Sequence, residues 1–122
     1  MSNQESRIVT RIIHELVLFY QLHGHQNIEL HTKAAENVFE IIIYSKPLSE
    51  SLLTQMRSKL DRERDLEIET YGWQLVGDLD AKNELEIVGH LIDKVNVEKL
   101  KNRMKITFSR FNRYKQKKTP KL

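Results

Sequence analysis

The residues suited to catalysis or metal binding are concentrated in the first third of the chain. Glu15 directly follows His14, and a carboxylate beside an imidazole is a combination used in general acid–base catalysis. A helix edge near solvent, or hydrogen bonds to neighbouring backbone, explains the same pair. His23, His25 and His31 are neutral imidazoles of the kind that bind zinc or copper. With no cysteine and no second ligand set at fixed spacing, a polar helix end and turn is the simpler interpretation, and we expect no metal.

A second group combines aromatic and basic side chains near the C-terminus. Its members are Phe108, Arg110, Phe111, Arg113, Tyr114 and Lys115. This mixture is used to stack on bases and to neutralise phosphates. The aromatic spacing of i, i+3 and i+6 fits a helical extension docked on the protein equally well. We therefore treat Arg110, Arg113 and Lys115 as candidate partner-binding residues. Trp73 is a further candidate, because tryptophan is enriched in binding hot spots, although a packing anchor is the alternative.

Composition indicates an ordinary globular protein of one domain. The 122 residues are 39% hydrophobic and 30% charged, without cysteine or a run of about 18 apolar residues that would span a bilayer. The N-terminus lacks a signal-peptide pattern, so we expect a cytoplasmic protein without membrane contact. Charge is uneven: residues 101–122 hold nine basic residues and no acid, whereas residues 1–100 hold 11 basic and 17 acidic residues, a net −6. The basic end is a solvated tail or is attracted to an anionic partner.

The first half of the sequence predicts a helix followed by a hairpin. Residues 6–24 repeat apolar side chains at helical spacing, with Ser6 as N-cap and Gly24 at the C-terminal end. Residues 27–33 alternate as a half-buried strand does. Residues 38–44 are β-branched and nearly continuously apolar, which predicts a more central strand paired with the first.

The second half predicts further helices and strands. Ser49 is a candidate N-cap for a helix through residue 64 with one apolar stripe. Residues 66–71 fit a strand or a continued helix, and the structure of 66–82 is not defined by the sequence. A helix over 83–93 then faces Leu85, Val88, Leu91 and Ile92 inward. Strands around 95–97 and 104–108 complete an α+β protein, a two-layer α/β sandwich with helices on one face of a mixed or antiparallel sheet.

This order resembles the Bergerat (GHKL) ATP-binding fold of histidine kinases, and most closely the bacterial anti-sigma-factor serine kinases. Their first nucleotide motif reads roughly E-x-x-x-N-x-x-x-H-G, and here Glu15, His23 and Gly24 are in register. Their C-terminal apolar-apolar-Asp-x-Val turn and V-x-V-E strand are similar to residues 91–98. The resemblance implies that Glu15 is the relic of a general base.

The resemblance also implies that nucleotide chemistry has been lost. The magnesium-binding Asn of the family is replaced by Phe19, which offers no oxygen ligand. The adenine-binding D-x-G-x-G is replaced by residues 44–47, which contain neither Asp nor Gly, and the phosphate-binding G-x-G by residues 82–84. We expect no cofactor; ATP and magnesium would bind only if this motif comparison is wrong.

These observations predict a non-catalytic regulator that acts through protein–protein binding, with residues 1–111 as a single Bergerat-like domain and 112–122 as a basic flexible tail. A homodimer is a further expectation, because the family's first strand is missing and a sheet edge is left open. The alternatives are a divergent ATP-dependent serine kinase that uses Glu15, and a nucleic-acid-binding protein that uses the basic tail.

Overall fold

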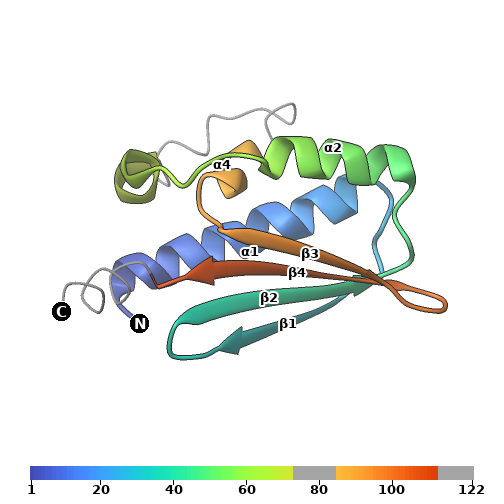
Figure 1. The fold of residues 1–122 in the computed structure, drawn as a ribbon, viewed down its shortest axis with the longest axis horizontal. Coiled ribbons are helices and arrows are strands. Elements are labelled where there is room, and N and C mark those ends of the chain that lie inside the picture. Colours follow the sequence, from blue (N-terminus) through green and yellow to red (C-terminus); the bar gives the residue numbers. More distant parts are fainter. Residues whose placement is uncertain (73–84, 113–122) are drawn as a thin grey trace. The chain divides into compact units, whose positions relative to one another are not determined.

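The structure, a computed structural model, describes residues 1–72 and 85–112 of an α+β protein (Figure 1). The chain groups into two compact units. A helical unit comprises Met1–Asn27 and Leu48–Leu91, and a sheet unit comprises Ile28–Pro47 and Ile92–Leu122. The expectation of a single domain over residues 1–111 stays a prediction. No helix in the described ranges has both the length and the apolar character needed to cross a membrane.

The first helix, α1 (Asn3–Leu22), begins earlier than predicted. Ser2, and not Ser6, is the N-cap: its hydroxyl accepts a hydrogen bond from the Glu5 amide at 3.0 Å. The prediction placed the start at the first apolar repeat, but a helix extends to the nearest residue that satisfies its free amides. At the other end, Gly24 has φ +83°, the left-handed conformation expected just after a helix.

The second helix, α2 (Glu50–Leu60), starts as predicted and stops earlier. The Ser49 hydroxyl accepts from the Leu52 amide at 3.1 Å, as an N-cap does. The predicted apolar stripe is buried; it consists of Leu52, Leu53, Met56 and Leu60. The helix ends at Leu60 because Asp61, with ψ 71°, leaves the helical conformation, whereas the sequence pattern carried it to Arg64.

A separate helical turn follows α2 where the sequence left strand and helix open. The segment η1 (Ile68–Gly72) is a π-helical turn, so the strand alternative is wrong. A carboxylate oxygen of Asp65 accepts from the amides of Glu67 at 2.9 Å and Ile68 at 3.3 Å, which fixes the start of this turn.

The short helix α4 (Glu86–Gly89) contacts both α1 and α2. It is shorter than the helix predicted over 83–93, whose first two residues lie outside the described ranges. The inward-facing residues were predicted correctly; those buried are Leu85, Val88, Leu91 and Ile92. Gly89 allows the close approach to α2: a Cβ here would lie 2.8 Å from the Lys59 carbonyl oxygen and 3.1 Å from that of Leu60.

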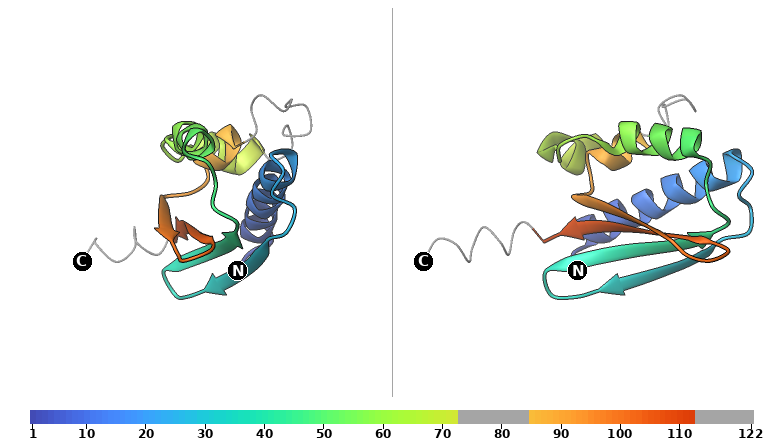
Figure 2. Two further views of the ribbon diagram at one scale, coloured as in Figure 1. Left: turned by 90° about the vertical axis from the view of Figure 1, so that its right-hand side faces the viewer. Right: turned by 45° about the vertical axis from the view of Figure 1, so that its right-hand side comes forward.

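The sheet unit is a four-stranded antiparallel sheet. Its strands are β1 (Glu29–Ala34), β2 (Val38–Ser45), β3 (Lys94–Lys99) and β4 (Met104–Phe111). They are arranged in the order β1-β2-β4-β3, so β2 and β4 are central and β1 and β3 form the edges (Figure 2). The predicted hairpins and the central position of β2 are confirmed, and the sheet is antiparallel throughout.

The register separates two faces of the sheet. On the central strands one face is buried and apolar; it contains Ile41, Ile43, Met104, Ile106 and Phe108. Because β4 is a strand through Phe111, Phe108 and Phe111 fall on opposite faces, and the alternative of a helical extension that includes both is wrong. The opposite face, here called the outer face, carries Glu29, His31, Lys33, Ile42 and Tyr44 from β1 and β2.

Prediction for Gly89. We expect Gly89→Ala to lower the free energy of unfolding by about 2 kcal/mol, because the added methyl group would overlap backbone carbonyl oxygens of α2, which cannot rotate away. Urea denaturation would measure the change. Gly24→Asn is the matched control: the space around Gly24 is open, and asparagine tolerates its positive φ. Equal stability of Gly89→Ala and wild type would contradict this account of the α2–α4 contact.

Candidate functional site

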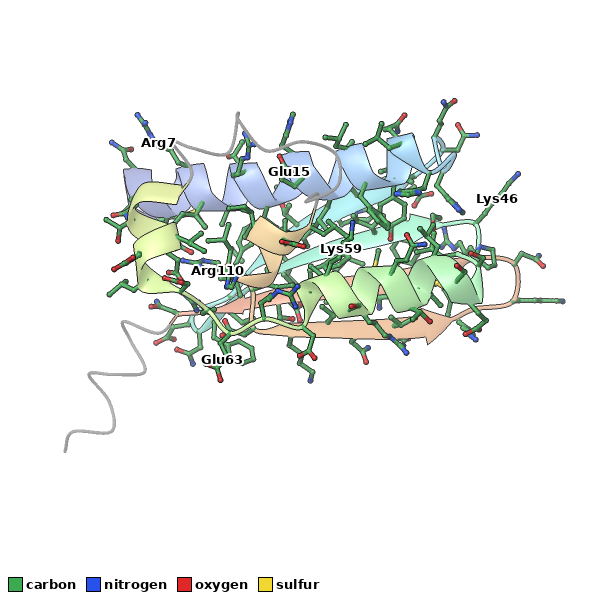
Figure 3. The ribbon with its side chains drawn as sticks, turned by 90° about the horizontal axis from the view of Figure 1, so that it is seen from above. Arg7, Glu15, Lys46, Lys59, Glu63 and Arg110 are labelled. Carbon is green, nitrogen blue, oxygen red and sulfur yellow. The ribbon has the colours of Figure 1, made fainter. Side chains whose placement is uncertain are left out.

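The candidate base Glu15 lies on the buried side of α1 and is held by an ion pair. One carboxylate oxygen of Glu15 lies 2.9 Å from Nη2 of Arg11, one helical turn earlier. The same oxygen lies 3.9 Å from Nε2 of His14. The Glu15 side chain is 10% exposed, compared with 61% for His14. Figure 3 shows Glu15 and Arg7 on this helix, with Arg7 directed outward. A carboxylate so enclosed and paired has little access to a substrate proton.

Phe19, one turn after Glu15, completes an apolar environment where the resemblance expects a magnesium ligand. Its side chain is 1% exposed. The ring packs edge-on against Tyr20, with centroids 6.1 Å apart, and against the ring of His23 at 4.6 Å. An aromatic ring offers no oxygen to a hard cation, so Phe19 packs against its neighbours and cannot itself be the magnesium ligand that the resemblance expects at this position.

The histidines are distributed over both units. His23 packs against Phe19, and His25 packs edge-on against Tyr20 with centroids 6.3 Å apart. His31 belongs to the sheet unit. Among residues 1–72 and 85–112, no group of three or more histidine, cysteine or acidic side chains is brought together in a way that would hold a metal ion.

The other nucleotide motifs have no acidic counterpart where they are described. In the stretch 44–47, which the resemblance matches to the adenine-binding motif, Ser45 is buried and its hydroxyl donates to the Lys46 carbonyl oxygen at 2.7 Å. This hydroxyl group is therefore engaged with the backbone of the next residue. Residues 82–84, at the position of the phosphate-binding glycines, lie outside the described residues.

Of the four partner-binding candidates, Arg110 lies within the described residues and the other three lie outside them. Arg110 is only 5% exposed, on the β4 face that also carries Phe108, so the structure does not support the prediction that it offers its charge to a partner. The reason is the strand period: alternate residues of β4 face the buried side, and Arg110 is one of them. Trp73, Arg113 and Lys115 lie outside the described residues, and their roles, including nucleic-acid binding, stay predictions.

Sequence reasoning missed a polar cluster on the outer face of the sheet. The Arg103 guanidinium stacks on the Tyr44 ring, 4.3 Å from its centroid, and its Nη1 lies 3.6 Å from a Glu29 oxygen. His31 packs edge-on against Tyr44 at 5.8 Å and lies 3.7 Å from Glu29. The predicted hairpin offered a signal, because its alternation places Glu29 and His31 on one face of β1.

A second missed feature is the exposed side of α1. Leu18 is 37% exposed and Leu22 is 54% exposed, one turn apart, in line with His14 and Arg11. A hollow of about 550 Å³ adjoins the preceding turns; the described residues that line it are Asn3, Ser6, Arg7, Thr10, Arg11 and His14. The exposed leucines thus continue the line of basic residues along the helix. We call this set of residues the α1 surface (Arg7, Arg11, His14, Leu18 and Leu22).

Comparison of the chain with protein-family models, with curated proteins and with solved structures found no match. Function therefore has to be argued from the side chains themselves.

Prediction for the Arg11–Glu15 pair. We expect Arg11→Ala to lower the free energy of unfolding by about 2 kcal/mol, because it leaves a buried carboxylate without its charged partner. The double variant Arg11→Met with Glu15→Leu should regain most of that loss, since no buried charge remains. His14→Ala is the control, with an expected change below about 0.5 kcal/mol at this exposed position. A loss for the double variant as large as for Arg11→Ala in urea denaturation would contradict the pairing argument.

Proposed function

We propose that this protein is a non-catalytic regulator that acts by binding another protein, on a degenerate Bergerat-like scaffold. In this proposal the chain is a two-layer α/β sandwich similar to that of the anti-sigma-factor kinases. The order of helices and strands and the single apolar face of the antiparallel sheet support this assignment.

One observation carries the non-catalytic part of the proposal. Glu15, which the resemblance aligns with the general base of the family, is buried and lies 2.9 Å from Arg11, while Phe19 one turn later is an apolar ring. Phosphoryl transfer requires a metal ion that bridges the phosphates and a base that reaches the attacking hydroxyl. The environment of α1 favours neither.

The α1 surface supports the binding part of the proposal. Exposed leucines in line with basic side chains match a partner that offers both apolar and acidic groups. Such a strip also suits contact with a helix or an extended segment better than contact with a small polar metabolite. The partner we propose is therefore a protein with an acidic, amphipathic segment.

Prediction for nucleotide binding. We expect the melting temperature to be unchanged by millimolar Mg-ATP or Mg-ADP. A nucleotide present at about 100 times its dissociation constant would add about 2.7 kcal/mol, which is several degrees for a domain of this size. A clear shift with Mg-ATP or Mg-ADP would overturn the proposal and favour the alternative of a divergent serine kinase, in which Glu15→Gln should abolish phosphoryl transfer. Inosine triphosphate without magnesium serves as the control for non-specific polyanion effects.

Prediction for the α1 surface. We expect a tagged chain to retain a specific protein from the extract of its native cells, and we expect Leu22→Asp to lose that protein. Mass spectrometry of the retained proteins is the measurement. Leu66→Asp is the matched control, because Leu66 is 74% exposed and lies outside the α1 surface. If Leu22→Asp retains the same protein as wild type, or if Leu66→Asp alone loses it, the binding site lies elsewhere.

A further inference from the structure

The edge strand β1 presents free backbone positions along one side of the sheet. Within the described residues β1 pairs with β2 alone. At the hairpin, the Ala35 amide donates to the Val38 carbonyl at 2.9 Å. In an antiparallel ladder such pairs alternate, so Lys33, His31 and Glu29 direct their N–H and C=O groups toward β2. The N–H and C=O groups of Leu30, Thr32 and Ala34 therefore point away from the sheet.

The outer-face side chains of β1 form a self-complementary charge pattern. Glu29, His31 and Lys33 are all exposed, and they place a negative, a titratable and a positive group at positions i, i+2 and i+4. When a second copy of β1 approaches in antiparallel orientation with the two-fold axis at His31, Glu29 of each copy lies opposite Lys33 of the other. In the same register Leu30 lies opposite Thr32 of the second copy, and their outward backbone groups can exchange hydrogen bonds.

We propose that two copies of this chain associate through their β1 edges in this register, so that the two sheets become one continuous sheet. The contact is isologous: the same strand on each copy supplies both halves, and the assembly closes as a dimer. The contact contains two Glu29–Lys33 pairs, each formed between one copy and the other. The outward backbone groups of both edges also gain hydrogen-bond partners. This inference is independent of the proposed regulatory function.

The second edge of the sheet does not pair with β1 in the corresponding way. Along β3, Lys94, Asn96 and Glu98 place the charges in the reverse order. In the antiparallel register that sets His31 opposite Asn96 of β3 in another copy, Glu29 lies opposite Glu98 and Lys33 lies opposite Lys94. Like charges directly opposite each other are destabilising. β1 is also the more open edge, since five of its six residues are exposed, compared with four of six in β3.

His31 lies at the two-fold axis of this dimer. His31 faces Glu29 at 3.7 Å, the Tyr44 ring at 5.8 Å and Ile42 across the ladder, with Arg103 stacked on Tyr44 and Lys33 two residues along β1. In the dimer its nearest new neighbour is His31 of the second copy.

Prediction for the β1 dimer. We expect sedimentation velocity of the full chain at pH 8 and low salt to give a mass near twice the 14.5 kDa of one chain. Lys33→Glu and Glu29→Lys should each raise the dissociation constant of the dimer at least about tenfold, because each sets two like-charged pairs across the contact. Mixing the two variants should restore the dimer, since the two acidic side chains on β1 of one variant then face the two basic side chains on β1 of the other.

The controls separate the β1 contact from general charge effects. Lys94→Glu and Glu98→Lys make the same charge changes on β3, and we expect them to leave the dissociation constant within about twofold of wild type. Thr32→Pro removes an outward N–H without removing a bond to β2, so the chain should keep its circular dichroism spectrum and sediment as a monomer.

Three results would overturn the proposal. The first is a wild-type chain that is monomeric at about 100 μM and pH 8. The second is a dimer that responds to the β3 variants and not to the β1 variants. The third is a mixture of Lys33→Glu and Glu29→Lys that stays monomeric while each variant keeps a native circular dichroism spectrum.

Discussion

The alternation of side chains along the central strands is the constraint on which the sheet depends. The cross-strand pairs Ile41–Phe108 and Ile43–Ile106 lie on one face of β2 and β4 and are almost completely buried. Since a shift of one residue would move every one of these side chains to the opposite face, burial of this face fixes the register. The same register determines what the outer face can display, including the stacking of Arg103 on Tyr44 and the exposure of His31.

Burial imposes a comparable constraint on α1. Glu15 sits among side chains that are removed from water, where a carboxylate without a partner is costly. Arg11 supplies that partner from the preceding turn, and so the pair belongs to the stability of the helix. A catalytic base needs the opposite arrangement, with one oxygen open toward a substrate. Glu15 is therefore buried in an ion pair on α1, an arrangement that contributes to the stability of the helix.

Much of the fold follows from the sequence, because periodicity reports burial. The nearly continuous apolar character of residues 38–44 identified β2 as a central strand, the apolar residues of 104–108 identified β4 as a strand, and the helical spacing before Gly24 identified α1. The errors arose where local signals compete. Ser2 and Ser6 are equally good caps, and only the extension of the helix distinguishes them. Phe108, Arg110 and Phe111 fit a helical spacing, but β4 continues through them because Val38, Phe39 and Glu40 of β2 pair with this end of the strand. The length of β4 is thus set by its pairing with β2, which a short stretch of sequence does not reveal.

The candidate sites were less predictable than the fold for the same reason. Arg110 was proposed as a contact from its charge, yet its position on the buried face follows from a register that pairs it with Phe39. In contrast, the effect of the charges on β1 and β3 can be assessed only when it is known that these two strands form the edges of the sheet. Each edge carries opposite charges two positions either side of its centre, in opposite order, so antiparallel pairing that sets the two centres opposite each other brings like charges together. An open sheet with two attractive, unlike edges would extend into fibres. Edges that oppose like charges when they meet disfavour that head-to-tail extension, while pairing of β1 with its own copy permits a closed dimer.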